Sequence, residues 1–196
     1  MEKAQQELII KRHDLSTDQS LRPFSAADEY LLNTLNDSNQ KPNALAIYHD
    51  RFGFLTCSLN ALNPTTIITN KSQLKALGLN VEANHLNLSP TSDPLSPLAI
   101  PSDFVLMKVP KSFSLFQLYL EHVAQNSTKD VTVVLGFMTR HFSTQILEIA
   151  QHYFENVEQS RAVKKARTIT LSNKKEVTKA NCVDELTYNN QSYQQY

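Results

Sequence analysis

Strand-like and helix-like segments alternate along most of this 196-residue chain, and few folds accommodate that pattern. Four short apolar or β-branched runs are each followed by apolar residues at helical spacing, at 44–48, 65–69, 104–109 and 131–136. The last run is apolar throughout, which is typical of parallel strands buried on both faces. A run at 8–11 predicts a further strand, and Val157 with the run at 167–171 predicts one or two closing strands. We therefore expect an α/β fold, a doubly wound and mostly parallel sheet with helices on both faces.

Glycine is scarce in this sequence. The chain has three glycines, no two of them close together: Gly53, Gly78 and Gly136. A dinucleotide loop or an ordinary S-adenosylmethionine loop needs clustered glycines, because its backbone turns tightly and approaches the ligand closely. Arg51 and Phe52 follow the strand at 44–48, where such a loop would have glycines. Asn70 follows the strand at 65–69, where a ribose-binding acid is expected. We therefore predict that this chain holds no cofactor.

Composition excludes several other classes of protein. Lys plus Arg and Asp plus Glu are 19 each, so no overall charge directs the chain to nucleic acid or to a membrane. Cys57 and Cys182 have no Cys or His neighbour at metal-site spacing. The first 22 residues lack the apolar stretch of a signal peptide, and the longest apolar run falls far short of the roughly 20 residues that span a bilayer. We expect a cytoplasmic protein that binds no metal and no membrane.

Three local features predict particular structures. Ser25, followed three positions later by Asp28, predicts the start of a helix. Four prolines between 89 and 101 predict a surface loop, because proline cannot donate a ladder hydrogen bond or continue a helix. Cys57 lies in an apolar stripe and is expected to be a small buried thiol rather than a nucleophile.

The histidines do not form an obvious catalytic or metal-binding pattern. His49 and Asp50 resemble an acid/base pair, but adjacent side chains at a strand end point apart and no nucleophile is near. A structural turn is the better explanation. His122, His141 and His152 lack the spacing of metal ligands and are expected on the surface.

The segment 159–180 is strongly basic. It has seven cationic side chains against Glu176 alone: Arg161, Lys164, Lys165, Arg167, Lys174, Lys175 and Lys179. Such density favours phosphate binding with steep salt dependence and little sequence choice. The alternative is a solvated hairpin face that binds nothing. Basic residues at two strand ends either extend this surface or are scattered charges. The candidate RNA-binding residues are Lys108, Lys111, Arg140, Arg161, Lys164, Lys165 and Arg167.

Four segments carry a resemblance to a known family: AADEYLL at 26–32, HDRFGFLTCSL at 49–59, VLMKVPKS at 105–112 and KKARTITL at 164–171. The chain resembles, over nearly its whole length, the N-terminal half of bacterial ribosomal RNA guanine-N2 methyltransferases, most nearly the large-subunit enzyme. That family joins two methyltransferase-like domains in one polypeptide. The C-terminal domain carries the cofactor loop and an Asn-Pro-Pro-aromatic catalytic motif, and neither motif occurs in this sequence.

The resemblance implies a Rossmann-like class I methyltransferase fold in a degenerate, non-catalytic domain that assists rRNA recognition and supports the catalytic half. Residues 1–172 would form this domain, and the polar segment 173–196 would be a linker or added edge leading to a C-terminal catalytic domain outside the chain. The implied partners are ribosomal RNA and that C-terminal domain. S-adenosylmethionine would bind there, and its methyl group would pass to a guanine exocyclic amine. Three tyrosines in the polar segment could stack on bases or pack at the domain edge: Tyr188, Tyr193 and Tyr196.

Two other functions stay open. A purely structural module would dock the catalytic domain and help it fold without touching RNA. It predicts that neutralising Lys164, Lys165 and Arg167 leaves activity on RNA unchanged. A small-molecule methyltransferase with an unorthodox loop is disfavoured by the residues after the first two strands, and saturable S-adenosylmethionine binding would support it.

Overall fold

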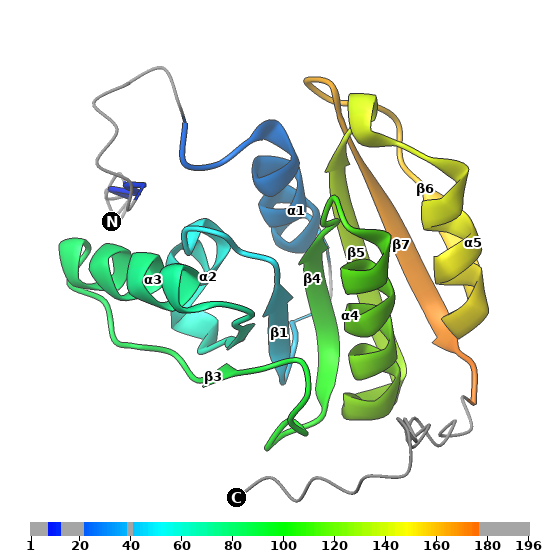
Figure 1. Cartoon of the computed structure of the whole chain (residues 1–196), viewed down its shortest axis with the longest axis horizontal. Helices are drawn as coiled ribbons and strands as arrows, with labels where there is room; N and C mark the ends of the chain where they lie inside the picture. Colours follow the sequence, from blue (N-terminus) through cyan, green and yellow to red (C-terminus); the bar gives the residue numbers. More distant parts are fainter. Residues whose placement is uncertain (1–7, 13–21, 39–40, 177–196) are drawn as a thin grey trace, which may run out of the picture.

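The computed structural model describes residues 8–12, 22–38 and 41–176. Seven strands occur in this part of the chain: β1 (Leu45–Tyr48), β2 (Thr65–Ile67), β3 (Thr91–Ser92), β4 (Ser102–Lys108), β5 (Ser127–Met138), β6 (Phe154–Gln159) and β7 (Ala166–Lys174). They form one sheet in the order β3-β2-β1-β4-β5-β7-β6 (Figure 1). The strands from β3 to β5 pair in parallel, whereas β7 runs antiparallel to both of its neighbours. The expected α/β fold with a mostly parallel sheet is confirmed.

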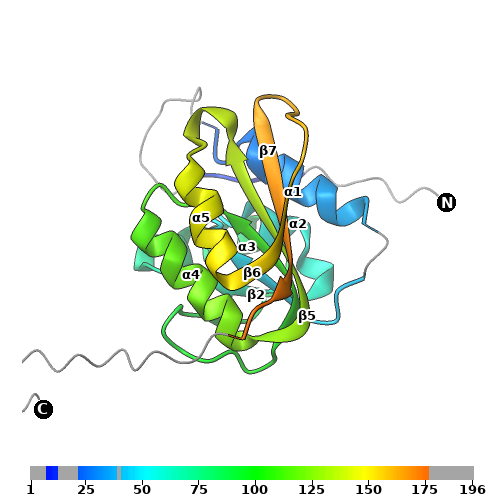
Figure 2. The same cartoon turned by 90° about the vertical axis from the view of Figure 1, so that its right-hand side faces the viewer.

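Helices cover both faces of the sheet, as predicted. They are α1 (Ala26–Asn36), α2 (Phe54–Ser58), α3 (Lys71–Ala83), α4 (Phe113–Asn126) and α5 (Thr144–Tyr153), with 3-10 turns at Asn60–Leu62 and Thr139–His141. The buried side chains of α4 and α5 form one core with the sheet, and those of α1 and α2 form a second core on the opposite face. Figure 2 shows α4 and α5 on one side of the sheet and α1 on the other.

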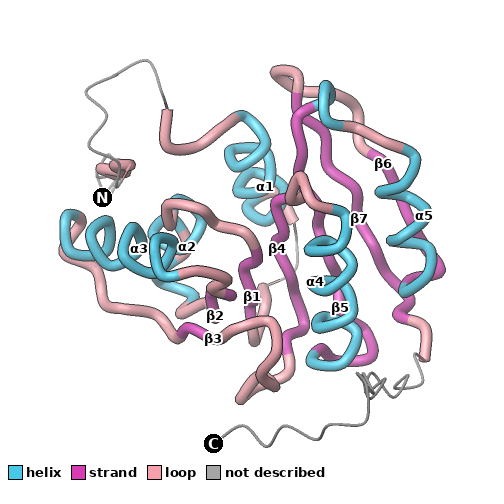
Figure 3. The backbone as a smooth tube through the Cα atoms, viewed as in Figure 1, coloured by secondary structure: helices cyan, strands magenta, loops and turns pink. Residues whose placement is uncertain are grey.

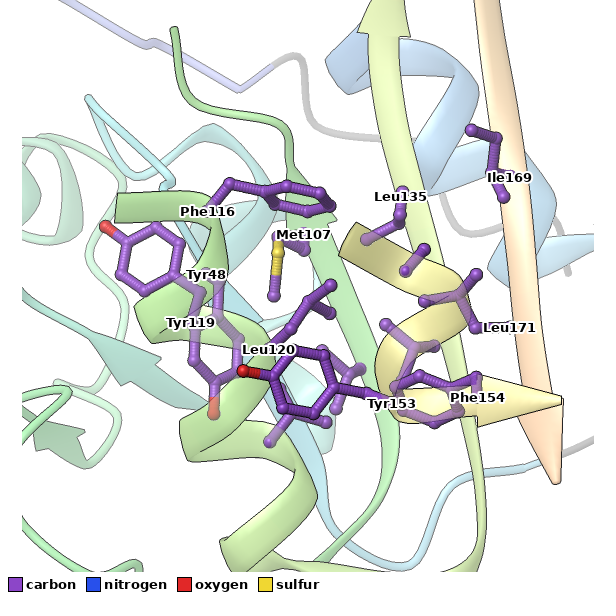
Figure 4. Close-up of a cluster of buried hydrophobic side chains, with 14 of the residues drawn as sticks. Tyr48, Met107, Phe116, Tyr119, Leu120, Leu135, Tyr153, Phe154, Ile169 and Leu171 are labelled. Atoms are coloured by element: carbon purple, nitrogen blue, oxygen red, sulfur yellow. The ribbon is translucent and has the colours of Figure 1, made fainter. Parts of the chain in front are cut away.

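The apolar run in β5 follows from burial on both faces. Val133, Leu135 and Phe137 belong to the core under α4 and α5, whereas Val134 belongs to the core under α1. Figure 4 shows the larger core, where side chains from β1, β4, β5, β7, α4 and α5 converge. At Gly136 the sheet and α1 come especially close. A Cβ atom there would lie 2.5 Å from Cγ of Leu31.

The segment 8–11 is not a strand, so that prediction is wrong. Its backbone instead bonds to the side chains of Asn80 in α3 and of Asn84, the C-cap residue of that helix. The Ile9 N–H donates to Asn84 Oδ1 at 2.8 Å, and Asn84 Nδ2 donates to the Ile9 carbonyl at 2.7 Å. Lys11 makes the same pair of bonds with Asn80, at 2.8 and 2.9 Å. The apolar residues of this segment pack against α2 and α3, which explains why the run resembled a strand.

The proline-rich segment 89–101 contains one short strand that the sequence did not predict. β3 lies directly after Pro90, at the edge of the sheet. The Pro90 carbonyl accepts from Thr66 N–H at 2.9 Å, and Ser92 O accepts from Ile68 N–H at 2.8 Å. A proline lacks only the donor, so it can still take part in a ladder through its carbonyl oxygen.

The last strand, β7, includes Asn173 and Lys174. Lys174 Nζ donates to the backbone carbonyls of Ala124 at 3.0 Å and Ser127 at 2.7 Å, and so ties β7 to the end of α4. Both residues were assigned to the polar segment by the sequence prediction, and in the structure they belong to β7. The division at residue 172 stays a prediction, and Lys179, Cys182 and the three C-terminal tyrosines lie outside the described residues.

Two local predictions are confirmed. Helix α1 begins after Ser25, whose backbone N–H donates to Asp28 Oδ2 at 2.7 Å. Cys57 is buried, and burial raises the pKa of its thiol to about 12, which leaves it unreactive at neutral pH. In the described ranges, no helix is both long and apolar enough to cross a membrane.

Candidate functional site

A cleft of about 910 Å³ opens at the carboxyl ends of β1, β2, β4 and β5. His49, Thr69, Val109 and Met138, which end or follow these strands, all line it. The loops after β1 and β4, pink in Figure 3, lie at this end of the strands. Ligands of doubly wound sheets bind in this position. The volume falls in the range of small-molecule sites, roughly 300–1,000 Å³.

The loop after β1 is shaped without a glycine cluster. His49 adopts a left-handed φ of 59°, and Gly53, with φ of 80°, precedes α2. Asp50 ties the loop down, because its Oδ2 accepts from both the backbone N–H and the hydroxyl of Thr56 at 2.8 Å. Gln73 Nε2 also donates to the Asp50 carbonyl at 3.3 Å. The segment is a closed, internally bonded turn, in agreement with the structural interpretation of His49 and Asp50.

Burial shifts the titration of both residues in this turn. It raises the pKa of Asp50 to about 6, although the hydrogen bonds from Thr56 oppose the shift. Burial, together with the nearby charges of Lys108 and Arg51, lowers the pKa of His49 to about 4, although the carboxylate of Asp28 opposes the shift. At neutral pH the His49 imidazole is therefore neutral. Neither group is arranged to pass a proton to the other.

One wall of the cleft carries two guanidinium groups on one aromatic ring. Arg51 lies over Phe52 with its Cζ atom 5.1 Å from the ring centroid, and Arg12 lies over the same ring at 5.6 Å. All three residues line the cleft. Bulky side chains thus stand where a methyltransferase loop would bring its backbone to the cofactor.

Three further cationic residues line the cleft: Lys108, Lys111 and Arg140. Lys108 Nζ donates to Asp28 Oδ2 at 2.6 Å, so this buried carboxylate partly offsets its charge. Lys111 and Arg140 are exposed. Arg140 Nε donates to Nε2 of His141 at 3.1 Å. Some desolvation, together with the charges of Arg140 and Lys111, lowers the pKa of His141.

A tight hairpin connects β6 to β7 at the same end of the sheet as the cleft (Figure 1). Val163 and Ala166 exchange two backbone hydrogen bonds across it, at 2.8 and 2.9 Å. Lys164 and Lys165 form the turn with φ of 47° and 63°. Positive φ at both positions is the requirement of a type I′ turn, which ordinarily takes Asn-Gly. The turn thus places two exposed cations in a conformation that lysine rarely adopts.

Backbone contacts fix this hairpin against the rest of the site. The Thr139 N–H donates to the Lys165 carbonyl at 2.8 Å, next to Arg140. Tyr30 of α1 donates its hydroxyl to the Arg161 carbonyl at 3.2 Å. Lys164 Nζ lies 3.9 Å from Glu29 Oε2, an exposed contact that leaves the lysine mostly free to bind other groups.

The predicted RNA-binding residues are therefore divided between two surfaces at one end of the sheet. Lys108, Lys111 and Arg140 line the cleft, whereas Arg161, Lys164 and Lys165 are exposed on the hairpin. Arg167 is half-buried in β7, opposite Phe137. Other members of the basic segment lie elsewhere: Lys174 and Lys175 are at the far end of β7, where both donate to backbone carbonyls.

Sequence reasoning missed several residues of the site. Arg51 follows a strand that leads into the cleft, so its position could have suggested a binding role. Arg12 had no such signal, because the asparagines of α3 bring its segment there. His122 was wrongly expected on the surface. It is buried, where Nδ1 accepts from Tyr48 Oη at 2.8 Å and Nε2 donates to the Ser96 carbonyl at 2.7 Å.

The other two histidines, His141 and His152, are exposed as expected. Over the described ranges, no three His, Cys, Asp or Glu side chains gather where they could hold a metal ion.

Comparison with solved structures identifies the fold. The chain is similar to the T. thermophilus 16S rRNA N2 G1207 methyltransferase in complex with AdoMet and guanosine, with a TM-score of 0.59 and 14% identity over 78% of this chain and 40% of that one. It is equally similar to precorrin-6y C5,15-methyltransferase from Geobacter metallireducens, with a TM-score of 0.59 and 14% identity over 80% of this chain and 94% of that one. The fold is that of Rossmann-like class I methyltransferases.

Curated relatives share more of the sequence. A Shewanella protein (strain MR-4) named ribosomal RNA large subunit methyltransferase G is 33% identical over 170 residues, which cover 84% of this chain and 45% of the relative. A protein of the same name from Pseudomonas savastanoi pv. phaseolicola is 33% identical over 83% of this chain and 45% of the relative. The chain thus spans less than half the length of these relatives. The family model described as RLMG N-terminal domain matches residues 1–175, and the chain belongs to that family.

Proposed function

We propose that this chain is the non-catalytic N-terminal domain of a cytoplasmic, S-adenosylmethionine-dependent 23S rRNA guanine-N2 methyltransferase, and that it helps a C-terminal catalytic domain engage ribosomal RNA. Family membership and the names of the relatives support the rRNA methyltransferase parent. In this proposal residues 1–172 form the domain, and 173–196 lead towards the catalytic half. The methyl donor binds in that half and methylates a guanine exocyclic amine.

The cleft supports the non-catalytic role. In place of a glycine-rich loop it has a turn closed by Asp50, with Arg51 and Phe52 lining the space. Its described lining residues include no Asp or Glu that would bind a ribose. The residues after β2, Thr69 and Asn70, also line the cleft, and Asn70 caps α3 by accepting from Gln73 N–H at 2.9 Å.

The observation that carries RNA recognition is the gathering of basic side chains at one end of the sheet. Three separate segments contribute: the loop after β4, the turn after β5 and the β6–β7 hairpin. The hairpin is joined to the turn after β5 through Thr139 and Lys165. A cluster of cations from several elements can neutralise successive phosphates, which is the main source of affinity in nucleic-acid binding.

The test uses a variant that removes charge without disturbing the hairpin. Lys164→Asn with Lys165→Gly replaces the pair with the residues that a type I′ turn prefers. We expect the variant to be at least as stable as wild type, because relief of two left-handed lysines is worth on the order of 1 kcal/mol or more. We expect its RNA affinity to fall and its salt dependence to become shallower. On single-stranded RNA the logarithmic slope should decrease by about 0.7 for each phosphate that the variant no longer neutralises.

The matched control is Lys75→Gln with Lys129→Gln, which changes the net charge equally. Lys75 is exposed on α3, and Lys129 is exposed near the start of β5, at the opposite end of that strand from the cleft. The control should bind RNA with nearly the wild-type salt slope. Equal affinities and slopes for wild type and hairpin variant would contradict RNA contact by the hairpin.

A structural role is the second candidate function. Three large apolar side chains between α3 and β4 are unusually exposed: Leu88 at 64%, Leu95 at 81% and Ile100 at 69%. Apolar groups left in solvent favour docking to another protein surface. If the hairpin variant of the whole two-domain enzyme methylates rRNA at the wild-type rate and affinity, the scaffold function is the better explanation.

A further inference from the structure

The cleft at the carboxyl end of the sheet has a strong charge bias. Five cationic side chains line it: Arg12, Arg51, Lys108, Lys111 and Arg140. Among the described residues that line the cleft there is no Asp or Glu, and the nearby Asp28 is already bonded to Lys108. A concave surface with charges of one sign concentrates ligands of the opposite sign.

This charge bias disfavours the ligand that the fold ordinarily binds. S-adenosylmethionine carries a sulfonium and an ammonium against one carboxylate, so its net charge is positive. A cleft lined by five cations therefore repels it. An anion of similar size is instead attracted by the same five cationic side chains.

The cations lie near two histidines of the cleft and affect the pKa of each. Beyond the effect of burial, Lys108 and Arg51 lower the pKa of His49, and the carboxylate of Asp28 opposes them. Some desolvation, together with Arg140 and Lys111, lowers the pKa of His141. Both imidazoles line the cleft. Each imidazole therefore lies close to cationic side chains of the cleft.

Aromatic rings provide the apolar part of the surface. The half-buried rings of Phe52 and Phe113 line the cleft, and Arg12 and Arg51 already lie over the ring of Phe52. Phe137, also at the cleft, is buried in the core and stacks on the exposed ring of Phe142, with centroids 5.8 Å apart. Bases of any sequence stack on such rings, while cations beside them hold the phosphate. The combination of rings and cations fits a phosphorylated nucleoside better than it fits inorganic phosphate alone.

We propose that this cleft binds a nucleoside 5′-phosphate, with the phosphate at Lys111 and Arg140 and the base against the ring of Phe113. The inference rests in part on the proposed function, since one source of this ligand is an unpaired nucleotide of the rRNA. The other source is a free nucleotide. Both sources present the same phosphate and base to the cleft.

The first experiment measures binding of adenosine 5′-monophosphate, adenosine, inorganic phosphate and S-adenosylmethionine to the 196-residue chain. We expect the monophosphate to bind at least tenfold more tightly than the other three, with an affinity that falls as salt is added. Binding should also raise the pKa of His141, measured by NMR, because an anion beside the imidazole favours its protonated form.

The second experiment assigns that binding to the cleft. Lys111→Gln with Arg140→Gln should weaken monophosphate binding at least tenfold, and both residues are exposed, so the fold is spared. The Lys164→Asn/Lys165→Gly variant and Lys129→Gln should bind the monophosphate as wild type does. Failure of the monophosphate to bind at 10 mM, or tighter binding of S-adenosylmethionine, overturns the inference. So does equal binding by the cleft variant.

Competition separates the two sources and the two proposals. Displacement of the monophosphate by a short single-stranded RNA identifies an RNA nucleotide as the occupant. Simultaneous binding of both identifies a free nucleotide.

If the hairpin variant loses RNA affinity while the cleft binds no monophosphate, the proposed function stands and this inference falls. If the cleft binds the monophosphate but the chain binds no RNA, the inference stands and RNA recognition falls.

Discussion

Replacing Gly136 by alanine tests how closely α1 approaches the sheet. The added Cβ would lie 2.5 Å from Leu31 Cγ, 2.7 Å from Cδ1 and 3.0 Å from Cδ2. Leu31 is fully buried, and Cγ is close to its backbone, so a simple rotamer change cannot clear the space. Overpacking of this kind lowers the free energy of unfolding by about 1–3 kcal/mol. We expect the upper end of this range, because the added Cβ would be too close to three Leu31 atoms at once. Replacing a glycine inside a strand by alanine also stabilises the folded state by roughly 0.5–1 kcal/mol, because alanine loses less backbone freedom on folding. We therefore expect a net loss of stability of about 2 kcal/mol.

The assay is urea unfolding of Gly136→Ala beside wild type and Gly78→Ala. Gly78 is an exposed residue inside α3, and a Cβ there meets nothing within 4 Å. Gly78→Ala should therefore stabilise the protein by about 0.5–1 kcal/mol, since the helix interior disfavours glycine. The same chemical change is thus expected to have opposite signs at the two sites.

A double variant tests the assigned cause. Leu31→Ala alone should cost about 2–5 kcal/mol by leaving a cavity. Combined with Gly136→Ala, the loss should fall short of the sum of the two single losses by at least about 1 kcal/mol, because the new methyl group occupies part of that cavity. Strict additivity, or a Gly136→Ala variant as stable as wild type, would refute the reasoning.

Three further predictions concern buried polar groups, each measured as the free energy of unfolding in urea at several pH values. Burial holds the folded pKa of His49 at about 4, below its unfolded value of 6.5, so stability is lost as pH falls from 6.5 to 4. His49→Asn, which tolerates the left-handed φ, should remove up to about 3 kcal/mol of that dependence, and an unchanged profile contradicts it. Asp50 acts with the opposite sign, because its folded pKa of about 6 lies above its unfolded value of 3.8. Stability is lost as pH rises from 3.8 to 6, and Asp50→Asn should abolish that loss. Tyr48→Phe leaves Nδ1 of His122 unpaired and should cost about 1–3 kcal/mol at neutral pH, whereas a neutral effect would mean that water replaces the hydroxyl.

Much of the fold could be predicted from the sequence, because its main signals arise from burial. The apolar run in β5 indicated a strand covered on both sides, and the core residues Val133 and Val134 do face opposite layers. Ser25 and Asp28 marked the start of α1 correctly, since that signal depends only on neighbouring residues. The antiparallel placement of β7 could not be predicted from its own residues, because strand direction depends on the connection that precedes it.

Elements that depend on distant partners were harder to predict. His122 is polar and lies on a helix, and its burial depends on Tyr48 and on the loop carbonyl of Ser96. The position of the cleft could be predicted, because it lies where the parallel strands end. Lys108 does lie at the end of β4, as expected. Its partnership with Asp28, 80 residues earlier in the chain, had no local signal. The left-handed conformation of the two hairpin lysines also had no local sequence signal, because lysine does not favour a turn of that type.

Asn80 of α3 and its C-cap residue Asn84 have a consequence for the charge of the cleft. They are one helical turn apart, about 6 Å along the axis, and the two residues that they bind are spaced by about 6.6 Å of extended chain. The spacing of the two asparagines therefore fixes the position of the main chain at Ile9 and Lys11. Because the bonds involve only backbone atoms of these two residues, their side chains do not matter. Arg12 follows directly and lines the cleft. Inserting one residue between Lys11 and Arg12 would leave the asparagine bonds intact and remove one cation from the cleft.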